Sequence, residues 1–138
     1  MSLQWRYERL ESLGVLALAG RLDTDTAPRF AGALAWPLSR GTGPVILDLT
    51  AHSGWDDAGR QAIATAARRL ATCARQLDLA AAPPSLAHAV TGDPRTPIAI
   101  HPDLAGALLA HGTDAPDPSA RRVWRTSGWP TADPTAHT

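Results

Sequence analysis

Two adjacent carboxylates are the residues of this chain whose type and spacing could do chemistry. Asp56 and Asp57 follow the apolar run Val45–Leu49 and precede a segment with apolar residues at helical spacing. Paired carboxylates can act as general acid and base or bind a divalent metal ion. The junction between a strand and a helix is also where an open α/β sheet places functional sites.

Other reactive side chains form no motif of known chemistry. The five histidines are scattered along the chain: His52, His88, His101, His111 and His137. With one cysteine and no His-x-x-x-His spacing, we expect neither a zinc site nor a disulfide. Cys73 is expected to be a small residue on or near the buried side of the central helix. All 13 basic residues are arginine, which excludes mechanisms that need a lysine, such as a Walker-type phosphate loop.

Length and charge indicate a single globular domain. The 138 residues suffice for one core, and 13 basic residues balance 13 acidic ones. A net charge of zero gives no global electrostatic reason to expect nucleic acid or an anionic membrane as partner. The polar first residues do not fit a signal peptide, and no apolar run approaches the about 18 residues of a membrane span. We therefore expect a soluble, cytoplasmic protein.

The first 44 residues predict a hairpin and a helix. Residues 3–9 alternate between apolar and polar side chains, as a half-buried strand does, and residues 15–19 supply its partner. Asp23 or Thr24 is then expected to cap a helix that runs to about residue 38.

The rest of the chain predicts alternating strands and helices. The continuous apolar run Val45–Leu49 favours a central strand, followed by an acidic turn at residues 53–59 and a helix to about Arg75. The remaining elements are a strand at 77–81, a helix at 86–90, a strand at 98–100 and a helix at 104–110. This order predicts an α/β fold with a mixed sheet of four to five strands, an N-terminal hairpin and about four helices.

The composition changes near Thr113. We expect residues 1–111 to form the domain and residues 112–138 to be a flexible tail, because the tail has too few apolar residues to offset the entropy of ordering. Residues 121–129 interleave arginines with two tryptophans. They fit either a docking peptide for an acidic partner or RNA, or a solvated tail whose tryptophans rest on the domain.

Several short motifs occur in order along the chain: Gly20–Asp23, Val45–Leu49, Asp56–Gly59, Val90–Gly92 and His101–Leu104. Together with the order of elements, they resemble the STAS domain of anti-sigma factor antagonists over about residues 3–110. In that family the third motif reads Asp-Ser-Ser/Ala-Gly. Asp56 then matches the family's aspartate, and Asp57 stands in place of its serine.

The resemblance implies a non-enzymatic domain that binds a partner protein and needs no cofactor or metal. In the family, the partner is an anti-sigma factor that is itself a kinase, and phosphorylation of the serine blocks binding. Asp57 cannot be a substrate of that kinase, and it carries one negative charge against about −1.5 to −2 for phosphoserine. The resemblance places the contact surface at the following residues: Asp23, Asp56, Asp57, Ala58, Gly59 and Arg60. Ser53 is an alternative site of phosphorylation.

Three interpretations of the acidic turn stay open. Asp56 or Asp57 caps the following helix, because a carboxylate accepts the free N–H groups of a first helical turn. Alternatively, Asp57 is a partial, permanent mimic of phosphoserine that locks the domain in a phosphorylated-like state, or tunes it to a partner without kinase activity. In the third interpretation the two carboxylates are catalytic, which requires them to converge on one substrate atom. An ion pair with Arg60 would weaken the second interpretation by partly neutralising the charge.

STAS-like subunits also accompany transporter ATPases, including lipid-transport systems. A subunit of such a complex is therefore a second hypothesis for the function, and an enzyme that uses Asp56 and Asp57 is a third. Trp55, before the acidic pair, either fills the core beneath the turn or is an exposed anchor for a partner.

Overall fold

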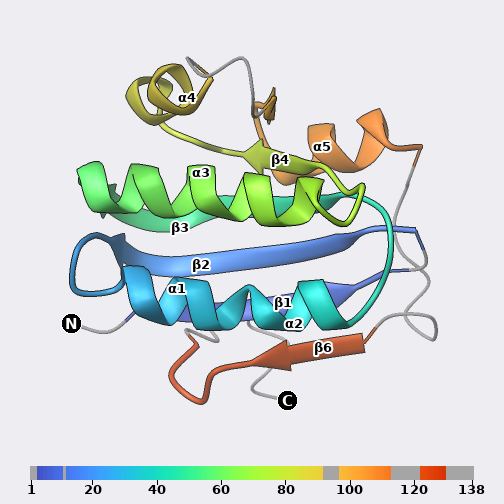
Figure 1. Ribbon diagram of the computed structural model, residues 1–138, viewed down its shortest axis with the longest axis horizontal. Helices are drawn as coiled ribbons and strands as arrows, with labels where there is room; N and C mark the ends of the chain where they lie inside the picture. The colour runs from blue at the N-terminus through green and yellow to red at the C-terminus, as the bar shows by residue number, and fades with distance from the viewer. Residues whose placement is uncertain (1–2, 11, 92–96, 113–121, 130–138) are drawn as a thin grey trace, which may run out of the picture.

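Six strands form one mixed sheet in the computed structural model, which describes residues 3–10, 12–91, 97–112 and 122–129 (Figure 1). The strands are β1 (Gln4–Arg9), β2 (Gly14–Leu22), β3 (Val45–Trp55), β4 (Leu77–Ala80), β5 (Ala99–His101) and β6 (Arg122–Arg125). Their order in the sheet is β5-β4-β3-β2-β1-β6. Strands β2 to β5 run parallel, whereas β1 is antiparallel to both of its neighbours. The predicted α/β class and N-terminal hairpin are confirmed, with one strand more than expected.

The helices also follow the predicted order. They are α1 (Ala27–Ala33), α2 (Ala35–Ser39), α3 (Asp57–Ala71), α4 (Pro84–Val90) and α5 (Leu104–Ala110). Helices α1 and α2 stand where one helix was predicted, and only Leu34 separates them. Pro37 explains the interruption, because it has no N–H to donate to the carbonyl of Ala33.

The sheet carries a large core on one face and a small one on the other. Alternate residues of a strand point to opposite faces, so Leu47 and Leu79 join the core beneath α1, α3 and α4. Their neighbours Ile46 and Ala80 join a second cluster with Ala107 of α5. Helix α5 therefore packs on the opposite face from the other helices.

Strand β3 is longer than predicted. The sequence predicted a strand that ends at Leu49 and a turn that includes residues 53–55, but the strand continues to Trp55. The apolar pattern stops at Leu49 because the later side chains are partly or fully exposed. The backbone nevertheless keeps pairing with β2 as far as the Leu22–Trp55 pair, with two register shifts. Backbone pairing, which hydropathy does not report, extends this strand.

The tail contributes a strand to the sheet. Strand β6 pairs with β1, and the ring of Trp124 stacks on Tyr7 with a centroid distance of 5.5 Å. The expectation of a flexible tail is therefore wrong for residues 122–125, because Trp124 supplies the apolar contact that the composition understated. Residues 113–121 and 130–138, to which the same expectation applied, lie outside the described residues.

Helix α3 ends before the predicted Arg75. Its last residue is Ala71, and Ala74 adopts a positive φ of 57° that no longer continues the helix. Cys73 lies in this turn and is exposed, so the expectation that it packs on the buried side of the helix is wrong. Arg75 leaves the helix and donates to the carbonyls of Gly43 and Pro37.

Within the described part of the chain, none of the helices has the length and apolar character needed to cross a bilayer.

Candidate functional site

Asp56 caps helix α3 and ties it to the loop after β2. One of its oxygens, Oδ1, accepts the N–H of Gly59 at 2.9 Å. The other, Oδ2, accepts both the N–H and the hydroxyl of Thr24 at 3.1 Å. The Gly59 N–H, followed by the Thr24 donors, lowers the pKa of the Asp56 carboxyl because each donor stabilises the ionised form. Of the two aspartates, Asp56 is therefore the helix cap.

Asp57 has different partners and points to solvent. It is the first residue of α3, and 72% of its side chain is exposed. Its Oδ1 lies 2.9 Å from both Nε and Nη2 of Arg60, and its Oδ2 accepts from Gln61 at 2.8 Å. The two carboxylates are held by separate partners rather than aimed at a common point, so their geometry gives the catalytic interpretation no support.

Asp23 organises the loop between β2 and α1. Its Oδ1 accepts the backbone N–H groups of Asp25 and Thr26, and its Oδ2 accepts from Arg21. The N-cap of α1 is Thr26, which makes no side-chain capping bond, so the prediction that Asp23 or Thr24 caps this helix is wrong. The hydroxyl of Thr24 is directed to Asp56 instead.

The close approach of α3 to β2 depends on Gly59. A Cβ atom on this residue would lie 2.2 Å from the carbonyl oxygen of Leu22, so any larger residue would push the helix away. Trp55, just before the acidic pair, is half-buried and packs against the large core. Of its two interpretations, the structure favours the one in which it fills the core beneath the turn.

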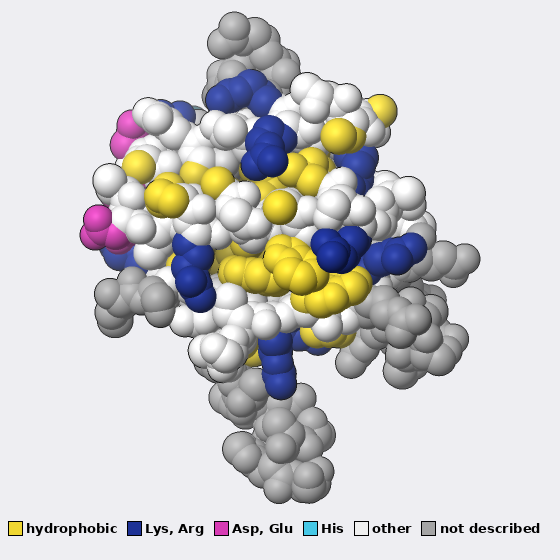
Figure 2. Space-filling view, turned by 60° about the horizontal axis from the view of Figure 1, so that its bottom comes forward, with side chains coloured by type: hydrophobic (Ala, Val, Ile, Leu, Met, Phe, Trp, Pro, Cys, Tyr) yellow, Lys and Arg dark blue, Asp and Glu magenta, His cyan; other side chains and the backbone are white. Residues whose placement is uncertain are grey.

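An apolar groove opens between α1 and α3, beside the start of α3. This α1–α3 groove has a volume of about 390 Å³. Alanines of both helices line it, among them Ala27, Ala31, Ala58 and Ala62, together with the larger apolar residues Pro28, Phe30 and Leu34. Arg69 and three uncharged polar residues complete the lining. Figure 2 shows apolar side chains gathered on the side of the molecule that carries α1 and α2, with arginines around them.

The residues expected at the contact surface divide into two groups. Asp57, Ala58 and Arg60 lie at the exposed start of α3, where Ala58 lines the α1–α3 groove and Arg60 lines a separate pocket between α3 and α4. Gly59 is buried, and the carboxylates of Asp23 and Asp56 are engaged in the hydrogen bonds that hold the loop and the helix start. These three residues hold the backbone that shapes this surface.

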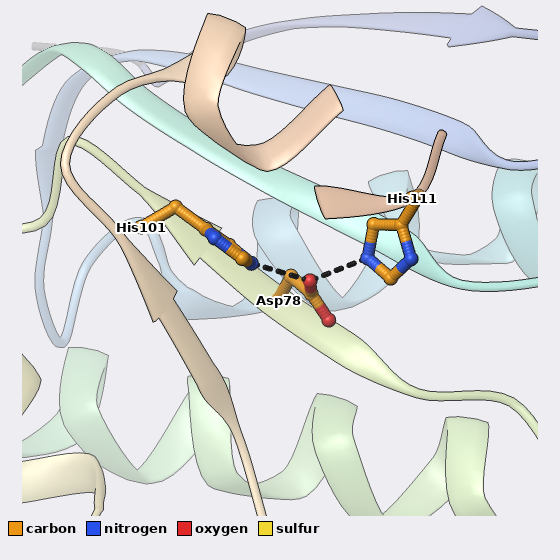
Figure 3. A group of neighbouring side chains, drawn as sticks. All are labelled: Asp78, His101 and His111. Carbon is orange, nitrogen blue, oxygen red and sulfur yellow. Dashed lines mark hydrogen bonds and ion pairs between the residues drawn. The ribbon is translucent and has the colours of Figure 1, made fainter. Parts of the chain in front are cut away.

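A second cluster, which sequence reasoning missed, joins Asp78, His101 and His111 (Figure 3). Nε2 of His101 lies 2.7 Å from Oδ2 of Asp78, and Nε2 of His111 lies 2.6 Å from the same oxygen. The three residues come from β4, β5 and the end of α5, so no local motif contains them. The single sequence signal is an aspartate inside the otherwise apolar strand Leu77–Ala80.

The family model described as Mlab, STAS domain, matches residues 5–91. The chain belongs to the STAS domain family. The resemblance inferred from the sequence motifs is confirmed at this level, and the fold is that of other STAS proteins. No curated protein matches the sequence of this STAS chain.

Solved structures of STAS proteins share the fold at low identity. The anti-sigma factor antagonist SpoIIAA in its unphosphorylated form is similar with a TM-score of 0.62 and 15% identity, covering 78% of this chain and 96% of that one. The phosphorylated form of SpoIIAA from Bacillus has a TM-score of 0.60 and 15% identity, covering 78% and 98%. The murine anion transporter Slc26a9 has a TM-score of 0.61 and 16% identity, covering 75% of this chain and 18% of the transporter.

Proposed function

We propose that this STAS protein is a non-enzymatic regulatory domain that acts by binding another protein, as an anti-sigma factor antagonist does. The observation that carries the proposal is the α1–α3 groove beside the exposed start of α3. Alanines of both helices line it beside Phe30 and Leu34, and the groove leaves room for an apolar side chain of a partner. A buried apolar anchor in a pocket is the usual source of affinity in a protein interface.

The charges at the groove indicate the chemistry of the partner. Arg69 lines the groove, whereas Arg60 and Arg68 line a separate pocket between α3 and α4. Arg69 is the charged residue in the lining of the groove and gives it a positive charge. The partner is therefore a protein that presents an apolar side chain flanked by acidic residues, because complementary charges favour encounter and fix the register.

Asp57 makes the proposed binding constitutive. A serine kinase cannot modify an aspartate, and the ion pair with Arg60 partly offsets the negative charge that would imitate phosphoserine. The phosphorylated-like lock is thereby weakened. In this proposal the domain binds its partner with Asp57 as it stands, and no phosphorylation at position 57 controls the complex.

A subunit of a transporter ATPase complex is the second candidate. The aspartate at position 57 favours this candidate, because a permanent subunit needs no phosphoacceptor there. The kinase-type anti-sigma factor and the transporter ATPase are both ATP-binding proteins. The first acts in transcription and the second in transport.

The experiment is a binding titration with a kinase-type anti-sigma factor and, separately, with a transporter ATPase, each followed by incubation with ATP. We expect a complex that forms equally well before and after incubation, with no phosphate on the chain. Phosphate transfer to Ser53 that releases the partner would contradict constitutive binding. Turnover of a substrate that depends on Asp56 and Asp57 would contradict the non-enzymatic role.

A further inference from the structure

We propose that Asp78, His101 and His111 form a binding site for a divalent transition-metal ion of the zinc type. The three side chains offer two imidazole nitrogens and one carboxylate oxygen, and these atoms all lie within 4.8 Å of one another. Two histidines and one carboxylate are a donor set that suits Zn²⁺ and its neighbours among the divalent transition metals. The site lies on the α5 side of the sheet, on the opposite face from the α1–α3 groove, and is independent of the proposed function.

The buried carboxylate is the first argument for the site. Asp78 is fully buried on β4, on the face of the sheet that carries Ala80 and α5 rather than the large core. Burial of a carboxylate is costly unless strong partners hold it. A cation bound between Asp78 and the two histidines supplies a stronger partner than hydrogen bonds alone do.

Rigid elements set the positions of all three donors. Asp78 pairs with Ala99 in the backbone ladder between β4 and β5, which places His101 two residues further along β5 on the same face of the sheet. His111 follows α5, whose start is fixed by the Asp103 carboxylate accepting the N–H of Gly106 at 2.7 Å. Donors on strands and at a helix end are held more precisely than donors on free loops.

A supporting residue orients the carboxylate. The side-chain amide of Gln76 donates to Oδ1 of Asp78 at 2.7 Å, which leaves Oδ2 directed at both histidines. Such hydrogen bonds behind a ligand fix its orientation and contribute to metal affinity. Asp78 thus has the supporting hydrogen bond that metal-binding carboxylates usually have.

The histidines form the route by which an ion reaches the site. The side chain of Asp78 is 1% exposed, whereas those of His101 and His111 are 15% and 24% exposed. An ion can therefore enter between the imidazoles and keep water as a further ligand. Because bonds to zinc of about 2.0 Å separate tetrahedral ligands by about 3.3 Å, each ring must move outward by roughly half an ångström. The Nε2 atoms then bind the ion instead of facing Oδ2, with the imidazole protons on Nδ1.

The test is a calorimetric titration of the chelator-treated full-length chain with Zn²⁺ alone. We expect one Zn²⁺ per chain and a loss of affinity of at least about 10-fold in His101→Gln and in His111→Gln, which each remove one ligand. Gln76→Ala should weaken binding about 10-fold without removing a ligand. His88→Gln, on the exposed side of α4, is the matched control and should bind as the wild type does.

Two further readouts separate binding from folding. Circular dichroism of each variant shows whether it folds, and His111→Gln changes the most exposed side chain of the three. Co²⁺ as a second probe gives a visible absorption band when nitrogen and oxygen donors surround it. A wild type without saturable Zn²⁺ binding would overturn the proposal. So would equal affinity of the wild type and the His101→Gln/His111→Gln double variant, and the cluster would then be a hydrogen-bonded network only.

Discussion

Arg60 binds Asp57 one helical turn away, with Nη2 of the guanidinium 2.9 Å from Oδ1 of the carboxylate. The carboxylate is largely exposed, and such pairs on a helix surface contribute only about 0.3–0.5 kcal/mol to stability. The importance of the pair is electrostatic. At the position where the sequence motifs predict the family's phosphorylatable serine, this chain holds a charge that is already partly compensated.

Removal of the Asp57 charge is expected to leave partner binding nearly unchanged. In Asp57→Asn and Asp57→Ser, affinity measured by calorimetry should stay within about 2-fold of the wild type, because the charge is exposed and offset. Arg60→Ala, which leaves Asp57 uncompensated, is the matched variant. A gain in affinity of about 10-fold or more in both Asp57 variants would instead support the phosphorylated-like lock.

Loss of the cap on α3 should destabilise the domain in a pH-dependent way. Asp56→Ala removes acceptors from Gly59 and Thr24 and should lower the Tm by about 3 °C at pH 7, whereas Asp56→Asn keeps one acceptor and should lose less. Since folding lowers the pKa of this carboxyl below its usual 3.8, its contribution is complete above that value. It disappears as pH falls through the lower folded pKa.

Thermal unfolding between pH 5 and pH 3 checks this sign. The Tm of the wild type should decrease more over that interval than the Tm of Asp56→Asn. Parallel curves for the two proteins would show that the charge of Asp56 adds no stability beyond that of an uncharged oxygen acceptor.

His52 should make the domain less stable at mildly acidic pH. Burial, with a smaller contribution from the charge of Arg21, lowers the pKa of its imidazole below the usual 6.5. Its Nε2 is buried and has no hydrogen-bond partner among the described residues. Below pH 6.5 the unfolded chain takes up a proton that the folded chain resists, so stability falls as pH falls.

The check is the Tm of the wild type and of His52→Gln between pH 7.5 and pH 5. We expect a smaller decrease in the variant, because glutamine does not titrate. His88→Gln, which replaces an exposed histidine, should keep the wild-type dependence. An unchanged slope in His52→Gln would contradict the assignment.

Trp124 should anchor the tail to the sheet. Its ring stacks on Tyr7 and lies 5.8 Å from that of Trp36, and the guanidinium of Arg40 lies over both tryptophan rings. Trp124→Ala should cost about 2 kcal/mol, less than a fully buried aromatic residue would. The neighbouring Val123→Ala, on the exposed side of β6, should cost less than about 0.5 kcal/mol.

Denaturant unfolding gives both free energies. Equal losses in the two variants would mean that β6 contributes no aromatic packing. Unchanged partner binding in Trp124→Ala is expected as well, because the tryptophan faces the domain rather than a ligand.

The sequence predicted those elements whose signal is local. Residues 45–49 stand out as an apolar strand, and the segment from Asp57 onward has helical spacing and an acidic N-cap. Which of the two residues caps the helix was not predictable, because both are aspartates and either suits the position. The answer depends on Thr24, which is 32 residues away and donates to Asp56.

The elements that were missed depend on contacts between distant parts of the chain. Strand β6 is held in the sheet by the packing of Trp124 on Tyr7. Its four residues lie between polar segments, so the hydropathy pattern gives no signal for a strand. The cluster of Asp78, His101 and His111 arises because β4 and β5 are adjacent in the sheet and α5 packs back over them. Spacing in the sequence reports neither relationship.

The most direct test of the central claim compares Ala31→Glu with Ala105→Glu in binding to the partner. Both residues are exposed alanines within helices, but Ala31 lines the α1–α3 groove and Ala105 lies on α5 at the other face of the sheet. A carboxylate in an apolar pocket of an interface must lose its hydration, so Ala31→Glu should weaken binding at least about 10-fold. Ala105→Glu should stay within about 2-fold of the wild type. Wild-type affinity in Ala31→Glu would contradict the claim that this domain binds its partner through the groove.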